Sequence, residues 1–122
     1  MSESTTCQTI NALICPVGEE PRLERICHSL NAFQQIVGGL IEPVSPYGGD
    51  WVAFAHEEGK ITGEPRNVFA EIICKVNGLE IFPDWLAGTV FFVGSTPLGE
   101  SVDVPERFAQ YAREAWIAGV MG

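Results

Sequence analysis

The sequence has few positive charges and no long hydrophobic segment. Its purely apolar runs are short, such as VFFV at 90–93, whereas a helix that crosses a bilayer needs about 18 apolar residues. Only seven Lys and Arg are present, and they are scattered. Proteins bind nucleic-acid phosphates through clustered cations, and this sequence contains no such cluster. We therefore expect neither a membrane protein nor a nucleic-acid-binding protein.

The four cysteines do not form the close pairs that are typical of a zinc site. Cys7, Cys15, Cys27 and Cys74 have wide, uneven gaps and no CxxC spacing. No basic residue precedes the first acid, so the N-terminus does not look like a secretory signal. We expect a cytoplasmic protein with four unpaired cysteines, no metal and no cofactor. Cys27 beside His28 suggests a catalytic pair, but neighbours on a strand point to opposite faces.

What the sequence does contain indicates one folded domain. It has 122 residues, of which 46% are hydrophobic and 19% charged, which is enough to bury roughly two-thirds of the unfolded surface. The net charge of −9 is spread without long acidic runs, and it favours solubility or a basic partner. We expect a flexible segment over residues 1–8 and a single globular domain over 9–122.

Hydrophobic periodicity predicts an α+β fold with a mostly antiparallel sheet of about four to five strands and two to three helices. Expected strands cover 9–15, 23–28, 40–44, 50–58 and 86–95, and expected helices cover 29–37, 68–76 and 103–116. Pro43 pushes its strand toward a sheet edge. A capping box of Asp103 and Glu106 is expected to begin the last helix. The apolar stripes of the helices are expected to be Leu30, Phe33, Ile36 and Val37; Phe69, Ile72, Ile73 and Val76; and Phe108, Tyr111, Ala112, Ala115 and Trp116.

The stretch HEEGKITGEPRN, residues 56–67, is the candidate site. A zinc-protease motif would need a second histidine at Lys60, and a phosphate-binding loop would need another glycine and an immediate hydroxyl residue. Adjacent acids splay apart on a strand, which argues against paired acid–base work. No nucleophile other than Thr62 lies close enough in the sequence to serve His56 as a general base. The residues that remain candidates for binding a ligand or partner are His56, Glu57, Glu58, Lys60, Arg66 and Asn67.

A structural interpretation of the same stretch is the favoured one. Gly59 supplies a positive φ after the strand, while Gly63 and Pro65 shape the crossing. Asn67 precedes the apolar stripe of a helix and is expected to cap it. Binding by an exposed loop on a rigid scaffold is the next most favoured reading.

The same residues resemble a known family. The pattern comprises Glu57, Glu58, Gly59, Lys60, Gly63, Pro65 and Asn67, then Gly88, Thr89, Val93 and Gly94, with VGGLIE at 37–42 as an earlier segment. It is similar to the uncharacterised family labelled domain of unknown function 3846. The resemblance implies small proteins of bacteria, plasmids and bacterial viruses, with no assigned activity. His56 departs from the pattern, where an amide such as Asn is expected.

Three functions follow as hypotheses. The first is a non-enzymatic interaction protein of a bacteriophage or mobile element that binds and modulates a host or defence protein. The second is a small-ligand-binding module that uses the 56–67 loop and the glycine turn at 47–50. The third is a small hydrolase using His28 or His56. The apolar C-terminal tail, with Ile117, Val120 and Met121 outside the helical stripe, is expected either to fold back over the domain or to hold copies of the chain together as a homo-oligomer.

Overall fold

The computed structural model describes residues 7–119, which form six strands and three helices. In chain order these are β1 (Thr9–Cys15), β2 (Arg22–Cys27), α1 (Leu30–Val37), β3 (Ile41–Val44), β4 (Trp51–His56), α2 (Val68–Val76), β5 (Val90–Ser95), β6 (Ser101–Val102) and α3 (Glu106–Ile117). The strands form one antiparallel sheet of order β2-β1-β5-β4-β3, with β6 paired to β5. The α+β prediction is confirmed. The sheet is larger than expected because Ser101, which the sequence placed in a loop, and the following Val102 pair with Ser95 and Gly94.

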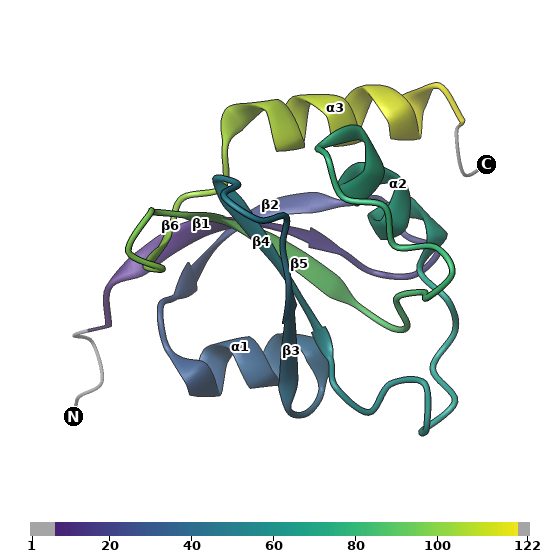
Figure 1. Ribbon diagram of the computed structural model, residues 1–122, viewed down its shortest axis with the longest axis horizontal. Helices are drawn as coiled ribbons and strands as arrows, with labels where there is room; N and C mark the ends of the chain where they lie inside the picture. The colour runs from purple at the N-terminus through teal and green to yellow at the C-terminus, as the bar shows by residue number, and fades with distance from the viewer. Residues whose placement is uncertain (1–6, 120–122) are drawn as a thin grey trace.

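The sheet separates two hydrophobic cores. Figure 1 shows α1 on one face and α2 with α3 on the other. The predicted alternation on β4 is confirmed: Trp51, Ala53 and Ala55 enter the core under α2 and α3, whereas Phe54 enters the core under α1. β5 lies at the centre and is buried on both faces, as its continuous apolar run VFFV predicts. Pro43 lies on the edge strand β3, as expected.

Two of the three helix starts follow their local signals. Ser29 Oγ accepts a hydrogen bond from Ala32 N at 3.1 Å, and Gly38 ends α1 with φ 90°. The capping box predicted for α3 is wrong. Pro105 occupies the N-cap position without a side-chain bond, and Asp103 Oδ1 instead accepts from Asn11 N at 2.8 Å. The segment after β6 runs beside β1, and the Asp103 carboxylate there provides an acceptor for the backbone N–H of Asn11.

The central residues of the predicted apolar stripes are buried, but residues at two of the stripe ends are exposed. Phe33, Val37, Phe69 and Ile73 are buried, but Leu30 and Val76 are exposed. On α2 the buried set also includes Ala70 and Cys74, because this helix packs against both the sheet and α3. The α3 stripe is confirmed, with Phe108, Ala112 and Ala115 buried and Tyr111 and Trp116 packed against the same core. Small side chains fill the positions where α2 approaches its neighbours most closely.

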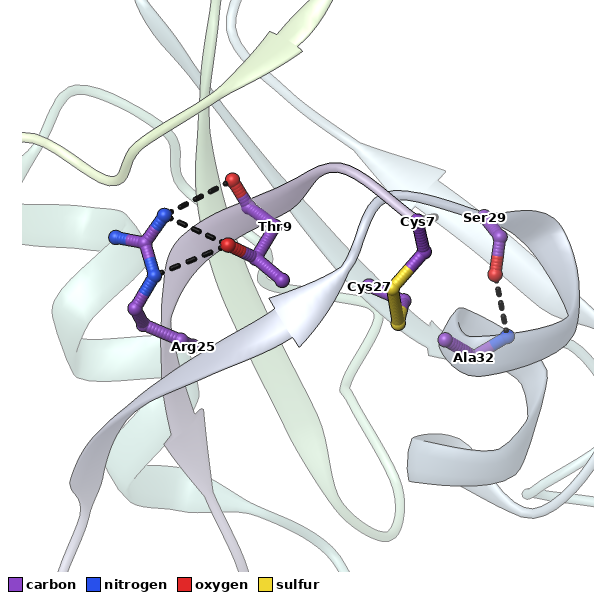
Figure 2. Close-up of a disulfide and its surroundings, with 6 residues drawn as sticks. All are labelled: Cys7, Thr9, Arg25, Cys27, Ser29 and Ala32. Carbon is purple, nitrogen blue, oxygen red and sulfur yellow. Dashed lines mark hydrogen bonds between the residues drawn. A yellow bond between two sulfur atoms is a disulfide. The ribbon is translucent and has the colours of Figure 1, made fainter. Parts of the chain in front are cut away.

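The expectation of four unpaired cysteines is wrong. Cys7 and Cys27 form a disulfide with a Cα–Cα distance of 5.6 Å, which ties the residues before β1 to the end of β2 (Figure 2). Antiparallel pairing places Thr9 opposite Cys27, so the chain just before Thr9 lies beside the second cysteine. Cys15 and Cys74 remain free and buried, and burial raises the pKa of the Cys74 thiol to about 12.

The two termini fall largely outside the described residues. Residues 1–6 of the segment expected to be flexible are not described, nor are Val120 and Met121 of the apolar tail. Within residues 7–119, no helix combines the length and the apolar character needed to cross a membrane.

Candidate functional site

The 56–67 stretch is one half of a paired-loop surface. It leaves β4 and enters α2, at the lower right of the molecule in Figure 1. The segment 79–88, which precedes β5, lies against it: Gly88 N donates to Pro65 O at 2.8 Å and Asn67 N donates to Leu86 O at 2.7 Å. We use the name paired-loop surface for residues 56–67 and 79–88 together. The sequence indicated the first segment only.

Asn67 is the buried anchor of this surface. Its Oδ1 accepts from Ala70 N at 3.1 Å, so the predicted cap of α2 is confirmed. Its Nδ2 donates to two carbonyl oxygens, those of Cys15 at 2.8 Å and Gly88 at 2.9 Å. The side chain therefore joins α2 to the end of β1 and to the segment before β5. With 2% of its surface exposed, Asn67 serves the fold and does not face a ligand.

His56 is held between a carboxylate and a glycine. Its Nδ1 donates to Glu64 Oε2 at 2.8 Å, and its side chain is 10% exposed. Its Nε2 lies against Gly39, where an added Cβ would approach to 2.1 Å. Glu64 in turn rests against Gly88, whose added Cβ would meet Glu64 Oε1 at 2.0 Å. Glu64 was not among the sequence candidates, because eight residues separate it from its partner in an irregular segment.

Lys60 joins the two loops at the surface. Its Nζ binds Asp84 Oδ1 and lies 4.5 Å from the centre of the Trp85 ring. The hydrogen bond from Lys60 holds the pKa of the Asp84 carboxyl below its usual range. The sequence identified Lys60 but gave no sign of Asp84 or Trp85, which lie more than twenty residues away. Lys60 therefore already has two partners within the fold, and a bound phosphate is not needed to explain its position.

Arg66 is also held by the fold. Its Nε and Nη2 donate to the two carboxylate oxygens of Glu71, at 2.9 and 2.7 Å. Glu71 Oε2 also accepts from Leu86 N at 2.9 Å, so the pair ties α2 to the second loop. Such a two-pronged arginine–carboxylate contact has a specific geometry. The remaining candidates, Glu57 and Glu58, are exposed, and no ion pair to either is found within residues 7–119.

The expected role of Gly59 is wrong in its mechanism. Gly59 does not have a positive φ; it is buried, and an added Cβ would lie 3.2 Å from Ala87 O. A larger residue would be crowded here, because the two loops approach each other closely at this point. Gly63 is the residue of the stretch with a positive φ, at 82°.

Large apolar side chains gather on the paired-loop surface. Ile61 is 85% exposed, Phe82 is 74% exposed and Trp85 is 42% exposed. Ile61 follows Lys60 in the chain, and Lys60 contacts both Asp84 and Trp85 of the second loop, on which Phe82 also lies. Exposed aromatic and aliphatic groups on fixed loops are typical of surfaces that bind other proteins.

A groove of about 360 Å³ borders this surface. It runs between β3 and the 79–86 segment and is lined by Glu42, Pro43, Val44, Ser45, Leu79, Glu80, Ile81, Asp84, Trp85 and Leu86. A second, shallow hollow of about 560 Å³ contains the glycine turn at 47–50. That turn precedes β4 and the 56–67 loop follows it, so the two segments lie at opposite ends of one strand. The two segments named in the ligand-binding hypothesis are thus separated by the length of β4.

The described part of the chain contains no assembled site for metal or thiol chemistry. Within residues 7–119, no group of three or more His, Cys, Asp and Glu is arranged to hold a metal ion. Cys27 is bonded to Cys7 and is not a free thiolate beside His28.

The comparisons with known proteins agree with this α+β architecture. Comparison with curated proteins gives no match. A crystal structure of the small RNA methyltransferase HEN1 contains a similar fold, with a TM-score of 0.58 and 16% identity. The likeness covers 94% of this chain but only 17% of that one, and at such identity it concerns the fold alone. The family pattern described as domain of unknown function (DUF3846) matches residues 10–117. It therefore extends well beyond the motif residues at 37–94, and the chain belongs to this family.

Proposed function

We propose that this protein acts without catalysis, by binding another protein through the paired-loop surface. The observation that carries the proposal is the exposure of Ile61, Phe82 and Trp85 on two loops that the fold ties together. Apolar and aromatic side chains in such positions supply most of the free energy of many protein interfaces. A monomer gains nothing by leaving them in water.

The rigidity of the two loops supports the proposal. The contacts of Lys60, Arg66 and Asn67 join them at three places along their length. A surface that is ordered before binding loses less conformational entropy when the partner arrives. The residues with fixed structural roles thus hold the scaffold, while the apolar side chains between them face outward.

The surroundings of His56 argue against a hydrolase that uses this histidine as its general base. A general base needs one ring nitrogen within reach of the proton it removes. The Nδ1 of His56 is bonded to Glu64, and its Nε2 presses against the backbone at Gly39. Both nitrogens thus lie beside groups of the fold, and only 10% of the side chain is exposed. The His56–Glu64 pair is an internal contact that joins the loop to the turn after α1.

The setting that we propose follows from the family resemblance. The protein would belong to a bacteriophage or mobile element and would bind and modulate a host or defence protein. Its small size and its net charge of −9 suit a protein that acts by attachment to a basic partner.

Affinity capture from host cells with three tagged proteins tests the proposal. The wild-type chain is compared with the double variant Ile61→Ser/Phe82→Ser and with the control Leu98→Ser. Leu98 is 91% exposed but lies in the turn between β5 and β6, at the opposite end of β5 from the paired-loop surface. All three proteins should give the same circular dichroism spectrum, because the altered side chains are exposed.

The expected result is a host protein that binds the wild type and the control but not the double variant. Loss of two interface anchors of about 2 kcal/mol each would weaken binding by several hundredfold or more. Capture that is unchanged in the double variant would mean that another surface binds the partner, and the proposal would be wrong.

A further inference from the structure

We propose that the groove beside β3 receives an extended, basic segment of the partner, which adds a strand to the free edge of the sheet. This inference rests on the proposed function and specifies the chemistry of the partner. One partner can engage both the groove and the paired-loop surface, because they share Leu79, Glu80, Ile81, Asp84, Trp85 and Leu86.

The outer edge of β3 offers backbone groups to a further strand. β3 pairs with β4 only, and in residues 7–119 no other strand pairs with it. Glu57 N donates to Leu40 O at 2.7 Å, so the residues two and four positions after Leu40 also direct their backbone groups toward β4. Ile41 and Pro43 alternate with these residues and direct their backbone groups outward. An added strand would therefore meet the N–H and C=O of Ile41 and the C=O of Pro43.

The side chains around this edge favour positive charge. Three carboxylates line the groove, from Glu42, Glu80 and Asp84, and no lysine or arginine is among its lining residues. Lys60 reaches Asp84 from outside the groove, and Lys75 approaches Glu80 at 3.6 Å. Both ion pairs are exposed to solvent, where paired charges attract each other only weakly, so a cation of the partner can share these carboxylates. No ion pair to Glu42 is found in the described part of the chain.

A second copy of this chain does not suit the groove. The chain carries sixteen acidic residues and only seven basic ones, so two copies repel each other at an acidic edge. Pro43 also lacks an N–H, and proline on an edge strand is a common means of discouraging sheet-to-sheet pairing. What remains accessible is a short ladder centred on Ile41. A short basic peptide segment fits this ladder, and strand addition is a known mode of peptide recognition.

Ten-residue peptides that alternate Lys and Thr provide the probe. All lysines of a bound strand point to one face, and the groove lies on the same face of β3 as Glu42 and Val44. The expected result is binding to the wild-type protein that weakens as salt is raised. The backbone amide of Ile41 should shift in NMR spectra and gain protection from hydrogen exchange. A peptide with Gln in place of Lys should bind about tenfold more weakly or not at all.

Peptides methylated on the backbone nitrogen test the strand pairing. Because N–H groups of alternate residues point to opposite edges of a strand, either the Lys set or the Thr set must face β3. Methylation of that set should abolish binding, and methylation of the other set should leave it. Any other pattern, or a bound peptide that leaves the Ile41 amide unchanged, would overturn the inference.

A matched pair of triple variants tests the charge of the groove. Glu42→Gln, Glu80→Gln and Asp84→Asn together should raise the Kd for the Lys–Thr peptide by about tenfold. The control combines Glu19→Gln, Glu20→Gln and Glu100→Gln, which are exposed, lie outside the groove and change the net charge by the same amount. Equal effects of the two triple variants would show that the overall charge attracts the peptide, and the inference would be wrong.

Adding the peptide to the affinity capture separates the two proposals. If a partner is lost in the Ile61→Ser/Phe82→Ser variant but is not displaced by the peptide, the proposed function stands and the strand-addition inference fails. If the double variant captures the same proteins as the wild type, the proposed function fails. The peptide measurements then still decide whether the groove binds basic strands.

Discussion

Replacing Asn67 with alanine removes three hydrogen bonds from a site that excludes water. The side chain is 2% exposed, caps Ala70 N, and donates to the carbonyl oxygens of Cys15 and Gly88. Loss of the cap alone costs about 1 kcal/mol. Each of the two amide hydrogen bonds adds about 0.5–1.5 kcal/mol, since a buried carbonyl oxygen is left without its donor. We therefore expect Asn67→Ala to lower the free energy of unfolding by about 3 kcal/mol.

Thermal and urea unfolding followed by circular dichroism measure this change. For a domain of this size about 3 kcal/mol corresponds to a fall in Tm of about 10–15 °C. Ser29→Ala is the matched control, because Ser29 Oγ caps α1 through Ala32 N, and residues 7–119 show no other side-chain hydrogen bond of Ser29. It should cost about 1 kcal/mol, the value for a cap alone. A loss of stability no larger in Asn67→Ala than in Ser29→Ala would refute the argument that the amide group also holds the strands.

Asn67→Asp separates the cap from the amide more sharply. Asp and Asn are equally good N-caps, so the bond from Ala70 N survives. The second carboxylate oxygen, however, would face the carbonyl oxygens of Cys15 and Gly88, which repel a negative charge. This repulsion raises the pKa of the new carboxyl in the folded state above its unfolded value of about 3.9. The destabilisation should therefore be present at pH 7 and shrink as the pH falls toward 4. Wild-type stability of this variant at pH 7 would show that Asn67 is a cap only.

Three further predictions concern contacts that the fold brings together. Gly39→Ala should destabilise the protein, because the new Cβ would lie 2.1 Å from His56 Nε2. Adding His56→Asn should recover part of this loss in urea unfolding. If the unfolding free energies of the two single variants simply add up in the double variant, the contact does not exist. Under denaturing, non-reducing conditions, thiol titration should find two free thiols per chain rather than four. The Cys7–Cys27 bond closes a loop with a sequence separation of 20, so its reduction should lower the unfolding free energy by about 3 kcal/mol. Deleting residues 117–122 should leave the circular dichroism spectrum and Tm unchanged, because Ile117 is 75% exposed. A shift to a smaller species in sedimentation would then show that the tail holds copies together, and a fall in Tm would show that it folds back.

Local patterns in the sequence determined most of the secondary structure. The alternation in β4 predicted which residues enter each core, and the apolar run in β5 predicted a strand buried on both faces. Asn67 and Gly38 were identified from their places at helix ends. These features could be predicted because each depends on residues within one or two turns of one another, where the period of the backbone sets the direction of every side chain.

The candidate site was predicted only in part, because its contacts depend on pairs that lie far apart in the chain. Lys60 was identified, but its partners Asp84 and Trp85 belong to a loop that the sequence left without a role. Glu64, which holds His56, lies in an irregular segment, where no period predicts the direction of a side chain. The structural interpretation of the stretch nevertheless agrees with the buried hydrogen bonds of Asn67.

The tertiary structure alone decided where the exposed and bonded groups of distant segments meet. Pairing of Thr9 with Cys27 brought Cys7 within reach of a disulfide that the spacing of the cysteines did not suggest. The path of β6 beside β1 diverted Asp103 from the helix cap to Asn11 N. The approach of the two loops places Gly59 against Ala87 O, a close contact that favours glycine where its φ does not. In each case the deciding interaction joins residues separated by about twenty positions or more, and their meeting follows from the order and register of the strands rather than from any local signal.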